Sequence, residues 1–163
     1  MKTKDLIFCS LFAALTAACS YIFIPLPFSP VPVNLALLPI FVAGALLGPK
    51  NGVIATIVYV LLGAFGLPVF NGGTGGLAVL TGPTGGYIIG YITCAYLSGK
   101  IKNPAGMIAG LLSCYTLGTL WFSFLTGTGI IAALTMCVVP FLIGDALKIA
   151  VATALVPRLK GRI

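Results

Sequence analysis

Two ionisable side chains lie three residues apart in an otherwise apolar segment near the end of the chain. They are Asp145 and Lys148, in the run GDALK that begins at Gly144. Residues three apart share one face of a helix, so the carboxylate and the ammonium are expected to lie side by side. Mutual neutralisation explains why both are tolerated, but not why an apolar helix carries them. Because ionisable residues inside a membrane usually mark a functional site, the pair predicts a site for a polar ligand.

A second group of polar side chains lies in a segment so rich in glycine that no helix is expected there. The segment Gly66–Pro83 carries Asn71, Gly73 and Thr74, and Thr84 follows it. Irregular backbone at membrane depth is tolerated where it is buried or lines a cavity. The residues alone are equally consistent with a flexible external loop. Pro83 suits the first turn of a helix, whose positive end is able to receive a carboxylate.

Composition places these residues in a membrane. Hydrophobic residues make up 60% of the 163 residues and charged residues only 7%, whereas soluble domains carry about 25% charged residues. We therefore expect an integral membrane protein and neither a soluble enzyme nor a nucleic-acid binder. The sequence has no histidine, only two acidic residues, and no motif for nucleotide binding, metalloprotease or hydrolase chemistry. No metal ligand set and no catalytic residue is predicted, and the five isolated cysteines are expected to be buried thiols.

Charged residues divide the chain into three long apolar stretches, each with room for two spans of about 20 residues. Proline and glycine mark the connections at Pro25–Pro32, Gly66–Pro83 and 126–129. The prediction is an all-α bundle in a single transmembrane substrate-binding domain, residues 1–163. Its six helices are Leu6–Ile24, Val33–Leu47, Gly52–Phe65, Thr84–Ser98, Ala105–Leu125 and Pro140–Val156.

The basic residues predict how this bundle lies in the cell membrane. In the six-span arrangement, one side carries Lys2, Lys4, Lys50, Lys100, Lys102, Arg158, Lys160 and Arg162. The positive-inside rule then places both termini in the cytoplasm. The basic and apolar N-terminus also imitates a signal peptide, but apolar residues continue to Ile24, which favours an uncleaved first helix.

The depth of Asp145 depends on where the last helix starts. Pro140 is expected to start it, with Ile130–Val139 as a separate outer segment. Asp145 then lies about 7 Å below that start, in the outer half of the membrane. On the first helix, Ala14 and Ala18 have the spacing at which helices approach closely in lipid. They are expected either to pack within the bundle or to face another protein.

The chain resembles the BioY family of biotin-specific S components of energy-coupling-factor (ECF) transporters. The resemblance covers essentially the whole chain and is carried by Pro30–Pro32, Phe41–Lys50, Leu67–Tyr91 and Pro140–Lys148. The combination of the motif GPTGGY with the later GDxxK is specific. The resemblance implies an S-component bundle of six helices that captures biotin from outside, without a cofactor.

The resemblance also implies partners and roles. An S component works with a membrane coupling protein and two ATPases, which alone use ATP, and is thought to topple in the bilayer to deliver the vitamin. Ala14 and Ala18 match the docking pattern of related S components. Asp145 matches the acidic site position and suits the N–H donors of the ureido ring. Lys148 matches the basic one and suits either the ureido carbonyl or the tail carboxylate, and Tyr87 suits the ring system.

The chain departs from the family pattern at three positions. Asn34 and Ala36 stand where Thr and Gln are common, and Asn71 stands where a small residue is frequent. Asn34 and Asn71 either supply replacement hydrogen bonds or alter the ligand. The alternatives are therefore an S component for another small carboxylated vitamin, a self-sufficient carrier or channel, and a membrane-embedded enzyme.

Overall fold

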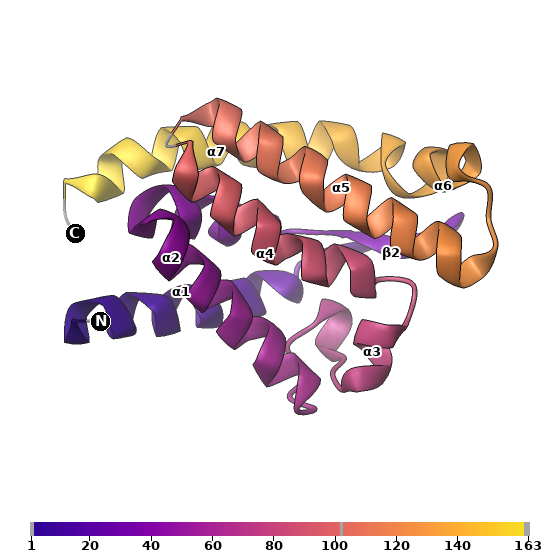
Figure 1. The fold of residues 1–163 in the computed structure, drawn as a ribbon, viewed down its shortest axis with the longest axis horizontal. Coiled ribbons are helices and arrows are strands. Elements are labelled where there is room, and N and C mark those ends of the chain that lie inside the picture. The colour runs from indigo at the N-terminus through magenta and orange to yellow at the C-terminus, as the bar shows by residue number, and fades with distance from the viewer. Residues whose placement is uncertain (1, 102, 162–163) are drawn as a thin grey trace.

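A computed structural model describes residues 2–101 and 103–161 as a mainly helical bundle (Figure 1). Lys102 and Arg162, used above for the orientation, lie outside the described residues. The α-helices are α1 (Thr3–Ser20), α2 (Leu37–Ala64), α3 (Leu77–Thr81), α4 (Gly85–Lys100), α5 (Pro104–Thr126), α6 (Ile130–Cys137) and α7 (Leu142–Lys160). Two short 3₁₀ turns, η1 (Asn71–Gly73) and η2 (Val139–Phe141), and the strands β1 (Phe23–Leu26) and β2 (Ser29–Asn34) complete the described elements.

Two of the expected helices form the two arms of α2. Gly48 interrupts the helix with φ 81° and ψ 174°, a backbone region that is essentially restricted to glycine, and Pro49 follows it. A Cβ atom on Gly52 would lie 2.8 Å from the Cα of Gly44, so the arms touch at their backbones beside this turn. The predicted break between Val33–Leu47 and Gly52–Phe65 is thus confirmed. The first arm begins later than expected, at Leu37, because the preceding residues belong to β2.

The all-α prediction was wrong around the first connection, which is an antiparallel β-hairpin. The pairs are Phe23 with Asn34, Ile24 with Val33 and Leu26 with Ser29. The helix expected over Leu6–Ile24 therefore stops at Ser20. Prolines alternate here with β-branched and aromatic residues, which favour extended backbone, whereas proline removes a donor that a helix would need. The prolines of Pro25–Pro32 thus specify strands where we expected a turn.

The segment Gly66–Pro83, where no helix was expected, contains the short helix α3, and the other boundaries shift by smaller amounts. The fifth helix, expected over Ala105–Leu125, is α5, and the expected separate outer segment is α6. Pro140 lies inside η2 and the last helix begins at Leu142, because the chain makes one 3₁₀ turn first. Pro83 likewise precedes α4 instead of lying in its first turn, since α4 begins at Gly85.

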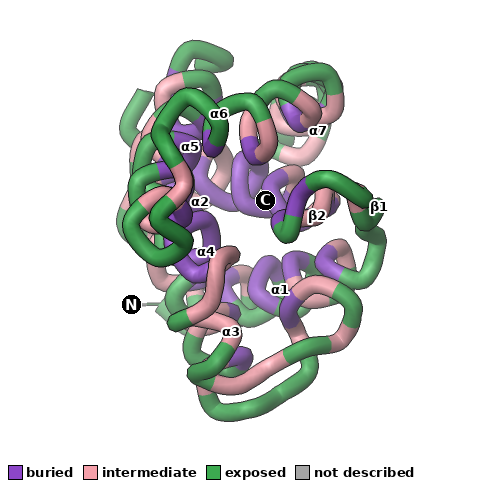
Figure 2. Tube along the Cα trace, turned by 90° about the vertical axis from the view of Figure 1, so that its right-hand side faces the viewer, coloured by how far each residue is buried: buried purple, intermediate pink, exposed green. Residues whose placement is uncertain are grey.

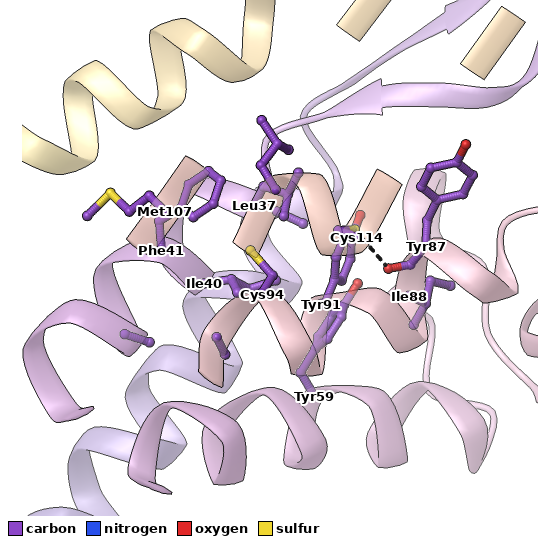
Figure 3. Packing of buried hydrophobic residues seen from close by; sticks show 14 of the residues in the cluster. Leu37, Ile40, Phe41, Tyr59, Tyr87, Ile88, Tyr91, Cys94, Met107 and Cys114 are labelled. Carbon is purple, nitrogen blue, oxygen red and sulfur yellow. Dashed lines mark hydrogen bonds between the residues drawn. The ribbon is translucent and has the colours of Figure 1, made fainter. Parts of the chain in front are cut away.

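The bundle is apolar on both its inner and its outer surfaces. The second α-helix, α2, packs against α1, α4 and α7, while α4 packs against α5. Buried residues line the interior in Figure 2, and Figure 3 shows Tyr59, Tyr91 and Cys94 among the side chains that fill it. Phe124, Ile131 and Ile143 are nevertheless more than four-fifths exposed. Such an outer surface suits lipid, since a helix that is hydrophobic all round belongs in a membrane or a large core.

Length and composition make several of these helices able to cross a membrane. Four stretches qualify among the described residues: Thr3–Ser20, Leu37–Ala64, Pro104–Thr126 and Ile130–Lys160. The two ends of the chain lie at the same end of the bundle, whereas α3 and α6 lie at the opposite end (Figure 1). The five cysteines are free thiols, and four of them are buried as expected, whereas Cys19 on α1 is half-buried.

Candidate binding site

The expected pair on α7 is buried and in direct contact. The Nζ atom of Lys148 lies 2.6 Å from Oδ1 of Asp145, and the two residues are 7% and 2% exposed. They lie in the first two turns of α7, on the face that meets the bundle. Isolated charges are costly to bury, and pairing offsets that cost only when further hydrogen bonds satisfy the remaining atoms. The second carboxylate oxygen therefore needs a partner as well.

That partner is Tyr115 of α5, which the sequence analysis missed. Its hydroxyl donates to Oδ2 of Asp145 at 2.5 Å, and the residue is buried. The bond joins α5 to α7 and leaves the carboxylate with a donor on each oxygen. A signal was available, because Tyr115 is the single tyrosine of its expected span and a buried tyrosine hydroxyl usually finds a partner.

A second hydrogen-bonded group lies nearer the hairpin. The amide nitrogen of Asn34 on β2 donates to Oδ1 of Asn71 at 2.6 Å and to the hydroxyl of Tyr91 at 3.0 Å. The backbone N–H of Ala36 donates to Oδ1 of Asn34 at 3.1 Å. Asn34 thus ties the β-hairpin to the glycine-rich segment and to α4. The two asparagines to which the sequence analysis drew attention are therefore direct partners.

Tyr87 contributes its ring to the site but uses its hydroxyl within the protein. The hydroxyl lies 3.2 Å from that of Thr119 and donates to the carbonyl oxygen of Cys137 at 3.4 Å. A Cβ atom on Gly118 would lie only 2.3 Å from the ring, so α5 needs glycine there to admit it. The ring of Tyr87 lines the inner cavity and is available for contact with a ligand, as expected. Its hydroxyl, in contrast, is already hydrogen-bonded within the protein.

These residues surround two adjoining cavities. The inner one has a volume of about 30 Å³ and is lined by polar and apolar side chains of β2, α2, α4, α5 and α7. The outer one has a volume of about 280 Å³ and lies between the β-hairpin and the segment before α4. Pro32, Asn71 and Thr84 line both cavities and form the neck between them. The inner cavity is lined by Val31, Pro32, Val33, Asn34, Leu37, Asn71, Thr84, Tyr87, Ile88, Tyr91, Cys114, Tyr115, Phe141, Asp145 and Lys148.

Most of the predicted site residues are thus brought together, from segments far apart in the sequence. Asn34, Asn71, Thr84 and Tyr87 join the charged pair around the inner cavity, while Thr74 lines only the outer one. Gly73 is not among the lining residues of either cavity. A Cβ atom on it would lie 3.2 Å from the ring of Tyr21, and its φ of 76° favours glycine. Its contribution is to the path of the loop.

The two alanines of the expected docking pattern lie elsewhere. Ala14 and Ala18 are both exposed on α1 and line neither cavity. Of their two interpretations, the simpler one, packing within the bundle, therefore does not hold. Their surface remains open for contact with lipid or protein.

The inner cavity can recognise a compact ligand with neighbouring donors and acceptors. Asp145 offers acceptor lone pairs and Lys148 offers donors, 2.6 Å apart at the buried wall. Apolar and aromatic side chains provide the rest of the lining, as is usual for small-molecule sites. Such sites have volumes of about 300–1,000 Å³, so a ligand would need both cavities and a widened neck.

Comparison with known proteins links this site to a family. The sequence profile of the BioY family matches residues 1–163. The chain is 36% identical to a probable biotin transporter BioY of Pyrococcus horikoshii, over 99% of each chain. It is 39% identical to the biotin transporter BioY of Thermotoga maritima, over 96% of each chain.

A solved structure is similar across nearly the whole fold. It is the crystal structure of the S-component for biotin from an ECF-type ABC transporter. The structures match with a TM-score of 0.89 at 30% sequence identity, covering 99% of this chain and 95% of the other. The mainly helical bundle is therefore an S-component fold.

The buried pair makes a testable contribution to stability. Asp145→Asn and Lys148→Met each leave a buried charge without its opposite charge, and each is expected to lower the free energy of unfolding by about 3–5 kcal/mol. The double variant removes both charges. Its loss of unfolding free energy is expected to be clearly smaller than the sum of the losses in the two single variants. Thermal unfolding in detergent measures all three, with Lys100→Met, an exposed residue on α4, as the control. Additive losses would contradict energetic coupling of the pair.

Proposed function

The chain belongs to the BioY family, and from this membership we propose that it captures biotin as the membrane-embedded S component of an ECF transporter. The observation that carries the proposal is the buried group formed by Asp145, Lys148 and Tyr115 at the wall of a largely apolar cavity. Its work is transport and not catalysis: the site has to bind the vitamin and release it unchanged.

The charged pair matches the ureido ring of biotin. That ring presents N–H donors on either side of a carbonyl acceptor. Asp145 accepts from an N–H and Lys148 donates to the carbonyl. This fits because Oδ1 of Asp145 and Nζ of Lys148 lie 2.6 Å apart, so they can meet an adjacent donor and acceptor of the ring. Tyr115 holds the carboxylate on α5 while the ligand approaches. We therefore favour the ureido carbonyl over the tail carboxylate as the partner of Lys148.

The valerate tail then extends toward the outer cavity. Thr84, at the start of α4, and Asn71 lie at the neck, where the tail carboxylate would pass. The N-terminal end of α4 carries positive partial charge, which favours a carboxylate. Thr74 lies further out, at the outer cavity. Gly73 shapes the loop that carries Asn71 and Thr74. Tyr87 packs its ring against the bicyclic ring system.

We further propose that the chain is a single transmembrane domain that crosses the cell membrane six times, with both termini in the cytoplasm. Two crossings are supplied by the arms of α2, and the others by α1, α4, α5 and α7 together with the outer α6. The described basic residues support the orientation, because they lie at the helix ends or the α2 turn beside the two termini (Figure 1). The cavities then open outward, beneath the β-hairpin.

Delivery to the cytoplasm requires partners in this proposal. A membrane coupling protein would dock on the exposed face of α1 that carries Ala14 and Ala18, where small side chains permit close approach. Two ATPase subunits would supply the energy, and the chain itself would need no cofactor. Another small carboxylated vitamin is the alternative ligand, favoured only by the Asn34–Asn71 contact at the neck.

Biotin binding to the purified protein in detergent tests this function. We expect tight binding by the wild type, weakened about 10-fold in Tyr115→Phe, because the hydroxyl no longer holds the Asp145 carboxylate in position for the ligand. Tyr96→Phe, on the exposed side of α4, is the matched control and is expected to bind normally. A folded wild type that ignores biotin but binds another carboxylated vitamin would contradict the assignment of substrate.

The partner of Lys148 can be identified with a modified ligand. Biotinamide keeps the ureido ring but lacks the tail carboxylate. If Lys148 donates to the ureido carbonyl, Lys148→Ala should weaken binding of biotin and of biotinamide by the same factor. If it pairs with the tail, the substitution should weaken only biotin. Isothermal titration with both ligands, on wild type and variant, separates the two roles.

A further inference from the structure

A long apolar groove lies outside the binding site, between α1 and α7. It has a volume of about 370 Å³, and residues of α2 form its floor. Phe8, Leu11, Leu15 and Cys19 line one wall, and Leu155 and Leu159 line the other. No charged side chain is among the lining residues. The view in Figure 2 shows α1 and α7 on the same side of the bundle.

The length of the groove corresponds to one leaflet of a membrane. From Phe8 to Cys19 the wall formed by α1 extends about 17 Å, at 1.5 Å per residue. Half of the hydrocarbon core is about 15 Å thick. The groove therefore accommodates one extended acyl chain that starts at the end of the bundle where the termini lie.

Three basic residues belong to the helix segments at that end of the groove. The Nζ atom of Lys4 lies 6.0 Å from the ring centroid of Phe8. Arg158 and Lys160 flank Leu159 in the sequence, and all three basic residues are exposed. The acidic residue nearby is Asp5, whose carboxylate accepts from the backbone N–H of Lys2 at 3.0 Å. Three basic side chains and one carboxylate thus belong to the helix segments at this end of the groove.

We propose that this groove binds one anionic phospholipid, with an acyl chain between α1 and α7 and its phosphate near Lys4, Arg158 and Lys160. The apolar groove alone would accept any lipid, whereas the basic end selects a negative headgroup. Ala14 and Ala18 do not line the groove, so the lipid would leave the proposed docking face uncovered. The inference rests on the chain lying in a membrane and not on the identity of its substrate.

Native mass spectrometry in mild detergent tests the proposal. The probes are dioleoyl phosphatidylglycerol and dioleoyl phosphatidylcholine, which share their acyl chains and differ in charge. We expect the wild type to retain one phosphatidylglycerol with at least a tenfold preference. The triple variant Lys4→Gln, Arg158→Gln, Lys160→Gln should lose that preference. The double variant Lys50→Gln, Lys100→Gln changes basic residues on α2 and at the end of α4, away from the α1 and α7 ends of the groove, and should keep it.

A substitution within the groove provides the second arm. Leu15→Trp should reduce retention of both lipids by filling the groove, and an unchanged midpoint of thermal unfolding in detergent would show that the variant is folded. Equal retention of the two lipids by the wild type would overturn the proposal. So would retention that Leu15→Trp leaves unchanged, or loss of preference in the Lys50 and Lys100 variant. Tight association of the groove with the coupling protein, which expels phosphatidylglycerol, would instead identify it as a protein interface.

Discussion

A carboxylate and an ammonium buried in an apolar bundle impose conditions on everything around them. Asp145 and Lys148 avoid the cost of isolated charges only while they remain 2.6 Å apart and Tyr115 donates to the second carboxylate oxygen. This requires α7 to present one face to the interior and α5 to lie opposite it. The function we propose depends on the same requirement. A ligand that forms hydrogen bonds with Asp145 and Lys148 can replace contacts that the protein otherwise has to provide.

The hairpin and the glycine-rich segment complete the site from the other side. Asn34 connects β2 to Asn71 and to Tyr91, so a strand, a loop and a helix meet above the charged pair. Beside this connection the inner cavity joins the outer one. In the proposed function, a ring system can therefore enter only when the hydrogen bond between Asn34 and Asn71 opens. The ligand would first meet the residues that set the path of the β-hairpin and of the glycine-rich segment.

The sequence was most informative where a physical rule acts locally. Spacing along a helix identified the contact between Asp145 and Lys148, and the charged residue Lys50, between two apolar stretches, marked the break between the two arms of α2. It was less informative about the hairpin, because apolar residues with many prolines suited both a helix end and a strand. The contact of Tyr115 with Asp145 joins residues 30 positions apart, so the single tyrosine of its span indicated a hydroxyl in need of a partner but not which residue the partner is. The family resemblance identified Tyr87 as a site residue, but the commitment of its hydroxyl to Thr119 and Cys137 needed coordinates.

The central claim is that the buried pair receives the ureido group, and infrared spectroscopy reports on that group directly. Biotin labelled with ¹³C at the ureido carbonyl would be bound to the purified wild-type protein, and its carbonyl stretch compared with that of free biotin in water. We predict a shift to lower frequency on binding, because an ammonium donates a stronger, charge-assisted hydrogen bond than water does. An unshifted ureido band in tightly bound biotin, with a shifted carboxylate band instead, would contradict the account.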